Sequence, residues 1–213
     1  MNAIFLSASV PVPGRGDYAK TANPTLIQFA VSALVRVVLG RRLLVWGGHP
    51  AITPMVRAAA EDLNVTLGHW VRLYQSRFFD GLYPDDNAAF PDVVPVEAVP
   101  DDRDASLEVL RRRMIGDHAF SAAVVIGGMD GAEREAGLFA AMHPTALLLP
   151  VASTGGAALK LHQRLTPDDA ETAFSVSYIE LFANRLGIDP AGPRAPKDSS
   201  PAPSRPPSPF ALG

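Results

Sequence analysis

Residues 123–135 have the residue types and spacing that can bind an anion. Their sequence, Ala-Val-Val-Ile-Gly-Gly-Met-Asp-Gly-Ala-Glu-Arg-Glu, predicts a buried strand, a glycine turn and a helix with carboxylates in its first turns. Glycine allows a tight turn and the close approach of a ligand, because no Cβ stands in the way. The N-terminus of the helix presents free N–H groups and a positive dipole end, which suit a phosphate group. One glycine turn is weak evidence for an anion site. The prediction is stronger if the ends of other strands converge on the same place.

The elements that position this turn alternate between strands and helices. Apolar runs predict strands over residues 3–9, 43–46, 70–75, 93–99, 123–126 and 146–151. Caps and apolar periodicity predict helices over residues 24–39, 50–63, 104–115, 157–165 and 167–186, and another that follows the glycine turn and ends near residue 142. The alternation predicts an α/β fold, a Rossmann-like open parallel sheet with helices on both faces. Ligands of such folds bind beyond the carboxyl ends of the strands.

Four predicted strand ends carry small residues that converge on this edge. They are Ser7 and Ser9, Gly47 and Gly48, Gly127 and Gly128, and Ser153, Thr154, Gly155 and Gly156. Small residues also permit tight turns without any ligand, but this explanation is weaker for four turns than for one. The spacing fits neither a dinucleotide fingerprint nor a P-loop. We therefore predict a nucleotide site formed mainly by turn backbones and helix N-termini, which includes Met129 and Gly131. His49 either contacts phosphate there or is an ordinary loop histidine.

The composition excludes several classes of function. The chain has 213 residues, a net charge of −3 and no cysteine, which rules out disulfides, thiolate catalysis and cysteine–zinc sites. The basic run over residues 111–113 does not indicate nucleic-acid binding, and the histidines lack metal-ligand spacing. We expect no metal and no cofactor. The apolar run over residues 29–39 is interrupted by Arg36 and no signal peptide is evident, so we expect a cytoplasmic protein that does not bind membranes.

The C-terminal region differs in composition from the rest of the chain. We predict a folded domain over residues 1–188 and a tail over residues 189–213, which contains eight prolines mixed with serine, glycine and alanine. Such a segment cannot bury a core, so we expect it to be extended and mobile. It is either a bare C-terminus or a tether for a partner.

Three motifs resemble those of the SLOG superfamily, which includes the LOG-type phosphoribohydrolases and nucleotide-sensing domains found beside TIR or sirtuin effectors in bacterial defence. Residues 4–18 resemble the opening strand of the family, and residues 45–48 (Val-Trp-Gly-Gly) its second-strand glycine motif. Residues 127–135 resemble its Pro-Gly-Gly-x-Gly-Thr-x-x-Glu signature. Here Ile126 replaces the proline, Ala132 replaces the threonine, and one more residue separates the second and third glycines.

The resemblance implies roles for a glutamate and an arginine. Glu135 keeps the spacing from Gly131 that the signature glutamate has, and in the hydrolases this residue works with an arginine of the preceding helix. Arg111 is our first choice for that arginine and Arg112 our second. A carboxylate near the sugar can orient water and stabilise an oxocarbenium-like transition state, while an arginine can bind the 5′-phosphate. Alternatively, these side chains lie on solvated helix faces.

Three functions follow as hypotheses. The first is a sensor of a nucleotide-derived molecule, such as AMP, NAD or a cyclic ADP-ribose variant, which needs the pocket but not the complete catalytic signature. The second is an N-glycosidase that releases the base from a nucleoside monophosphate. The third is an interaction module that uses the aromatic residues 74–90 as a contact surface, although this segment could instead cover the pocket or fill the core. The resemblance also implies a homodimer and a possible effector partner.

Overall fold

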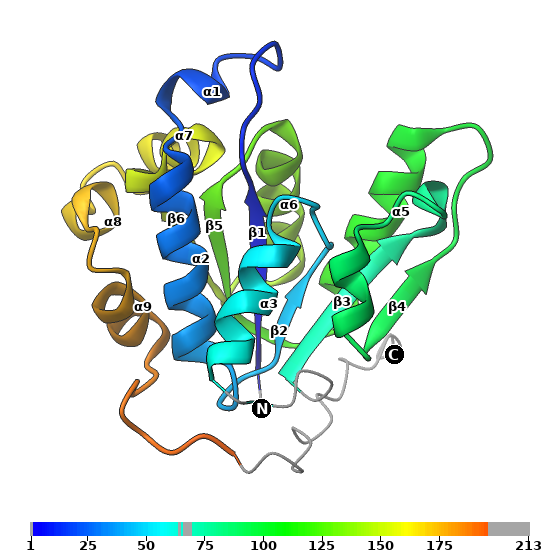
Figure 1. The fold of residues 1–213 in the computed structure, drawn as a ribbon. Helices are drawn as coiled ribbons and strands as arrows, with labels where there is room; N and C mark the ends of the chain where they lie inside the picture. Colours follow the sequence, from blue (N-terminus) through cyan, green and yellow to red (C-terminus); the bar gives the residue numbers. More distant parts are fainter. Residues whose placement is uncertain (1, 64, 66–69, 196–213) are drawn as a thin grey trace, which may run out of the picture.

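A six-stranded parallel sheet forms the centre of the protein (Figure 1). The structure is a computed structural model and describes residues 2–63, 65 and 70–195. The strands are β1 (Ala3–Ser9), β2 (Leu44–Trp46), β3 (Val71–Ser76), β4 (Val93–Val96), β5 (Phe120–Gly127) and β6 (Leu147–Val151). Their order in the sheet is β4-β3-β2-β1-β5-β6, so the chain builds outward from β1 in one direction and then returns to its other side.

Helices cover both faces of this sheet, which confirms the predicted Rossmann-like α/β fold. They are α1 (Tyr18–Thr21), α2 (Pro24–Val38), α3 (Thr53–Asp62), α5 (Arg103–Gly116), α6 (Asp130–Met142), α7 (Gly156–Leu165), α8 (Ala170–Phe174) and α9 (Tyr178–Leu186). One core cluster joins α2, α3 and α9 to the sheet, and a second joins α5 and α6 to the opposite face. Ile4 and Leu6 of β1 belong to the first cluster and Phe5 to the second, because successive side chains of a strand point to opposite faces.

The sequence from residue 167 to 186 forms two helices, so the prediction of one continuous helix was wrong. α8 and α9 are separated by residues 175–177, and Ser175 has an extended backbone with ψ of 134°. The Ser175 carbonyl accepts a hydrogen bond from Ser153 Oγ at 2.8 Å. Tyr178 is 3% exposed and its hydroxyl lies 3.0 Å from the same Ser153 oxygen. A contact distant in the sequence therefore fixes the break between the two helices.

The aromatic segment between β3 and β4 is ordered by local turns and by the core. It contains the 3-10 helices η1 (Arg77–Phe79) and η2 (Asp85–Ala89). At its end Phe90 is 3% exposed and packs edge-on against Trp46, with ring centroids 5.0 Å apart. At its beginning Tyr74 is 1% exposed. Part of this segment therefore fills the core, which was one of its predicted roles.

Residues 189–195 follow α9 and lie against the C-terminal end of α2. The Arg41 guanidinium donates hydrogen bonds to the carbonyls of Pro190 and Gly192, both at 2.7 Å, and the Ala195 N–H donates to the Gly40 carbonyl at 2.8 Å. The rest of the predicted tail lies outside the described residues, and the domain boundary at residue 188 stays a prediction. Within the part of the chain that the structure describes, no helix has both the length and the apolar character needed to cross a membrane.

Candidate functional site

A cavity of about 390 Å³ opens at the carboxyl edge of the sheet, over the ends of β1, β2 and β3. Chain order reverses beside β1, and open α/β sheets bind ligands at such positions. The loop after β3 and the helices α5 and α6 complete its walls. The polar and charged residues that line it are Ser7, Ser9, Arg15, His49, Gln75, Ser76, Tyr83, Arg103, Asp104, Arg111, Asp130, Arg134 and Glu135.

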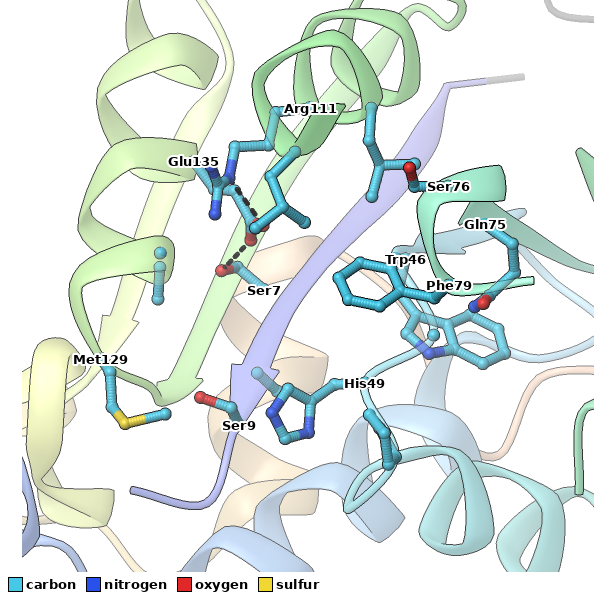
Figure 2. Close-up of a pocket in the computed structure, with 18 of the residues that line it drawn as sticks. Ser7, Ser9, Trp46, His49, Gln75, Ser76, Phe79, Arg111, Met129 and Glu135 are labelled. Carbon is cyan, nitrogen blue, oxygen red and sulfur yellow. Dashed lines mark hydrogen bonds and ion pairs between the residues drawn. The ribbon is translucent and has the colours of Figure 1, made fainter. Parts of the chain in front are cut away.

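Three polar side chains from different elements meet in this cavity. Ser7 comes from β1, Arg111 from α5 and Glu135 from α6 (Figure 2). Ser7 Oγ donates a hydrogen bond to Glu135 Oε2 at 2.5 Å, and Arg111 Nε lies 3.6 Å from Glu135 Oε1. Ser7 has the same parity in β1 as Phe5, whose side chain packs under α5 and α6, so its hydroxyl reaches Glu135 on this face.

Burial sets the electrostatics of this cluster. The exposed fraction of the side chain is 9% for Arg111 and 21% for Glu135. Burial raises the pKa of Glu135, while the hydrogen bond from Ser7 and the positive charge of Arg111 oppose this shift. Arg111 Nε has no hydrogen-bond partner among the described residues, since 3.6 Å is too long for one. The guanidinium therefore keeps donor capacity for an anion that enters the cavity.

Further charged residues surround the mouth of the cavity. Arg15 pairs with Asp130 at 2.8 Å, and Arg103 pairs with Asp104 at 3.1 Å. Both pairs are largely exposed, so they contribute little to stability and can exchange partners at small cost. Arg134 is exposed and also lines the cavity. The rim can therefore offer several guanidinium groups to a ligand phosphate.

His49 lies in the turn after β2 and faces the cavity beside Ser9 (Figure 2). The Ala51 N–H donates a hydrogen bond to His49 Nδ1 at 3.2 Å, so the proton of the neutral ring is assigned to Nε2. Burial, assisted by the positive charge of Arg15, lowers the pKa of His49. The ring is therefore neutral at pH 7 and provides one N–H donor.

The chain has relatives among known protein families. A family model described as the SLOG cluster3 family matches residues 17–186. The chain belongs to the SLOG cluster3 family. No curated protein matches it. Among solved structures, the X-ray structure of TM1055, a structural genomics target, is similar over 87% of this chain and 99% of that chain, with 15% sequence identity and a TM-score of 0.45.

In this SLOG chain, two of the four predicted strand ends contribute to the cavity, together with residues at the start of α6. The predicted site residues that line it are Ser7, Ser9, Gly47, Gly48, His49, Arg111, Met129, Gly131 and Glu135. A Cβ on Gly131 would lie 3.1 Å from Arg111 Nη2, so a glycine there leaves room for the guanidinium. The ends of β1 and β2 and the start of α6 thus meet at one place, as the sequence predicted.

The first two glycines of the SLOG signature have a packing role and do not line this cavity. Gly127 has a φ of +60°, and a Cβ there would lie 2.6 Å from Ile27 Cδ1. Gly128 has a φ of +86°, and a Cβ there would lie 2.6 Å from Ala132 Cβ. Both glycines let the chain turn tightly from β5 into α6, and their contact with a ligand stays a prediction.

The turn after β6 also packs against the protein and does not line this cavity. Thr154 is fully buried, and its hydroxyl accepts a hydrogen bond from the Gly127 N–H at 2.8 Å and donates to the Val151 carbonyl at 2.6 Å. Ser153 is used in the contact with Ser175 described above. A Cβ on Gly155 would lie 2.0 Å from the Thr21 carbonyl oxygen, and one on Gly156 would lie 2.6 Å from the Gly128 carbonyl oxygen. These small residues allow neighbouring segments to approach.

The arginine run of α5 divides between the interior and the surface. Arg111 is 8% exposed and faces the cavity. Arg112 is exposed and pairs with Glu108 one turn earlier, at 2.8 Å. Successive residues of a helix are rotated by about 100°, so neighbouring arginines cannot share one face. The structure therefore places Arg111, our first choice, next to Glu135.

Sequence reasoning missed several cavity residues at the end of β3 and in the adjacent loops. The missed residues include Arg15, Trp46, Gln75, Ser76 and Phe79. Gln75 and Ser76 could have been found from the sequence, because they are polar residues at the carboxyl end of a buried strand. The prediction of the site relied on small residues that permit tight turns, and a glutamine is not one of them.

Two other histidines, His118 and His162, have structural surroundings. His118 Nε2 lies 2.9 Å from the Tyr74 hydroxyl, and burial lowers the pKa of His118 to about 4. His162 Nδ1 lies 3.2 Å from the hydroxyls of Thr166 and Thr172. The described residues contain no group of three or more histidine or acidic side chains that could hold a metal ion.

Proposed function

We propose that this SLOG chain binds a nucleotide-derived small molecule in the cavity and acts as a sensor of that ligand. The observation that carries the proposal is the state of Arg111. Arg111 is 8% exposed and lines a cavity at the reversal of strand order, and its Nε has no hydrogen bond to the described residues. A planar guanidinium binds phosphates and carboxylates bidentately, and phosphate is the group of this kind that every nucleotide carries.

The surroundings of Arg111 also fit a sugar phosphate. The Ser7 hydroxyl and the Glu135 carboxylate can bind ribose hydroxyls, and the neutral His49 ring adds a donor from the opposite turn. Membership of the SLOG cluster3 family supports a nucleotide-related ligand through the resemblance of its motifs. AMP, NAD and ADP-ribose derivatives all combine these chemical groups.

A sensor fits Glu135 better than a hydrolase does. One carboxylate oxygen accepts the short hydrogen bond from Ser7, and the other faces Arg111. A carboxylate held in this way is a fixed recognition group, whereas hydrolysis requires it to orient a water against the sugar. The altered glycine signature is consistent with binding without turnover.

Thermal unfolding with AMP, NAD and ADP-ribose at millimolar concentration tests the proposal. A ligand at about a hundred times its Kd stabilises a protein by about 2.7 kcal/mol, so at least one should raise Tm by about 5–10 °C. Arg111→Met should lose this shift, and the matched variant Arg112→Met should keep it. The proposal is contradicted if no nucleotide raises Tm, or if both variants respond like the natural protein.

A second function, an N-glycosidase that cleaves a nucleoside monophosphate, is favoured by one observation. Glu135 keeps the spacing of the signature glutamate, and Arg111 of the preceding helix lies beside it. Chromatography of AMP incubated with the protein would detect adenine and ribose 5-phosphate. Release that disappears in Glu135→Gln would establish the enzyme, whereas binding without release would leave the sensor.

We also propose, from the family resemblance, that the protein is a cytoplasmic homodimer that acts with an effector in bacterial defence or signalling. Light scattering after size-exclusion chromatography would give the mass in solution, and a monomer would contradict the dimer. The third hypothesis, a ligand-free interaction module, receives less support. Phe90 and Tyr74 are buried, and Phe79 and Tyr83 line the cavity, so few of these aromatic side chains are free to contact a partner.

A further inference from the structure

We infer that Gln75 selects the base of the bound nucleotide, an inference that rests on the proposed function. Gln75 lies near the carboxyl end of β3, lines the cavity and is 6% exposed. Its Nε2 atom is buried and has no hydrogen-bond partner among the described residues. Burying an amide without a partner is costly, so the free protein maintains an unfavourable group at this position.

The Gln75 amide lies directly beneath the turn after β2. A Cβ on Gly48 would lie 1.7 Å from Gln75 Nε2 and 2.5 Å from Leu73 Cδ1. Gly48 has a φ of +65°, so a residue with a side chain would be both strained and in collision. The glycine thus leaves room for the amide beneath the turn. Gly48 therefore does more than allow a tight turn. It also leaves the space that the Gln75 amide occupies in the wall of the cavity.

Other groups beside Gln75 suit a planar ring. Trp46 lines the same wall, is 2% exposed, and its Nε1 also has no hydrogen-bond partner among the described residues. Phe79 projects into the cavity between this wall and Ser7 (Figure 2). The Phe79 ring can stack on any base, while the Gln75 amide can bind its edge. This side of the cavity therefore has the character of a base pocket.

The anion-binding groups lie on the other side of the cavity. β2 separates β3 from β1, so Gln75 is about 10 Å from the β1 strand that carries Ser7. Arg111 and Glu135 lie beyond Ser7, on α5 and α6 (Figure 2). A nucleotide that spans the cavity would thus have its phosphate near Arg111 and its base near Gln75.

An amide side chain pairs best with an edge that presents a donor and an acceptor next to each other. Rotation of the Gln75 amide exchanges its oxygen and nitrogen, so either atom can face the cavity. Adenine presents such an edge through its 6-amino group and N7, and glutamine binds this edge bidentately. We therefore assign the 6-amino group of adenine as the feature that Gln75 recognises.

A double-mutant cycle with two nucleotides tests the assignment. Calorimetry would measure the Kd of AMP and of purine riboside 5′-monophosphate, which lacks the 6-amino group, for the natural protein and for Gln75→Met. The natural protein should bind AMP about tenfold more tightly, the effect of one hydrogen bond whose partner is otherwise left unpaired. Gln75→Met should bind both nucleotides equally. An exposed glutamine of α7 gives the matched control Gln163→Met, which should retain the preference.

A measurement of Tm shows whether Gln75→Met has changed binding by disturbing the fold. Because Gln75 Nε2 is unpaired in the free protein, Gln75→Met should keep Tm or raise it while it removes the preference for AMP. A preference for AMP that persists in Gln75→Met, or a marked fall of Tm, would overturn the assignment. If the natural protein binds neither nucleotide nor any other nucleotide tested, the proposed function itself fails. Tight binding without any preference for AMP refutes only the role of Gln75.

Discussion

The turns after β5 and β6 and the ends of β1, β2 and β3 carry similar small residues, but they differ in what surrounds them. At Gly127, Gly128, Gly155 and Gly156 an added Cβ would meet core side chains or backbone atoms of other segments. At the ends of β1 and β2, Ser7, Gly47 and Gly48 line the cavity. The first region fixes the packing of the chain, and the second forms the candidate site.

A glycine in a turn indicates that another group comes close to the backbone there. The glycine does not show whether that group belongs to the protein or to a ligand. Glycine is required wherever the backbone has positive φ or another group comes within Cβ distance, and that group can be protein or ligand. Gly128 is approached by Ala132 and Gly155 by Thr21, whereas Gly48 is approached by the cavity residue Gln75. Substitutions can therefore separate the two regions by their effects on stability and on binding.

Gly155→Ala should have the largest effect. The backbone at Gly155 has φ of 74° and ψ of −159°, a region open essentially to glycine, and a Cβ would lie 2.0 Å from the Thr21 carbonyl oxygen. We expect the free energy of unfolding to fall by more than about 4 kcal/mol, as measured by urea titration. Gly137→Ala on α6, where the added methyl meets open space, should instead stabilise by about 0.5–1 kcal/mol. Similar results for both variants would contradict the packing role of the β6 turn.

Lowering the pH should destabilise the fold through His118, which is buried just before β5. In the unfolded chain this ring takes up a proton near its ordinary pKa of 6.5, but in the fold its pKa is about 4. The unfolded state therefore binds the extra proton, and stability falls as the pH drops from about 6.5 to 4, by up to about 3 kcal/mol. Chemical denaturation across this range would measure the loss. In His118→Gln the free energy of unfolding should depend less steeply on pH. An unchanged dependence would exclude His118 as its source.

Gly48→Ala should have a smaller effect on folding and a larger one on binding. The groups that its Cβ would meet are side chains, Gln75 and Leu73, which can move more easily than backbone. We expect a loss of about 2 kcal/mol in stability and at least a tenfold loss in AMP affinity, from calorimetry. Gly81 also has a positive φ, +82°, but a Cβ there would have no neighbour within 4 Å. Gly81→Ala therefore introduces backbone strain without a collision and should preserve binding. Equal affinities in both variants would separate Gly48 from the site.

Arg15→Ala at the rim should have the smallest effect on stability. Its ion pair with Asp130 joins side chains that are 47% and 61% exposed, so its removal should change the free energy of unfolding by less than about 0.5 kcal/mol. Any loss of AMP affinity should shrink as salt is raised, because exposed charges are screened. A loss that is independent of salt would place Arg15 in direct, shielded contact with the ligand.

Much of the fold could be predicted because its signals are local. Apolar runs of three to eight residues marked the strands, and Asn23 with Pro24 marks the start of α2, where Asn23 Oδ1 accepts the Leu26 N–H at 3.1 Å. The break between α8 and α9 could not be predicted in this way. It depends on Ser153, which is distant in the sequence from Ser175.

The candidate site shows the same division between local and distant information. The order of strands brings β1 next to β2 and β5, so Ser7, His49 and Glu135 meet as the parallel fold required. The choice of Arg111 over Arg112 depends on the rotation of α5 about its axis, which the sequence alone left open. Gln75 was missed because its significance lies in an unpaired amide, and pairing can be judged only in three dimensions.

Hydrogen exchange with and without AMP tests the central claim most directly, because it maps the bound ligand onto both regions at once. Binding at the cavity predicts slower amide exchange over residues 7–9, 46–49, 75–79 and 129–135, with little change over residues 152–157. Arg111→Met should abolish this protection, and Arg112→Met should leave it unchanged. Protection centred on residues 152–157, with none at the ends of β1 to β3, would contradict the assignment of the site.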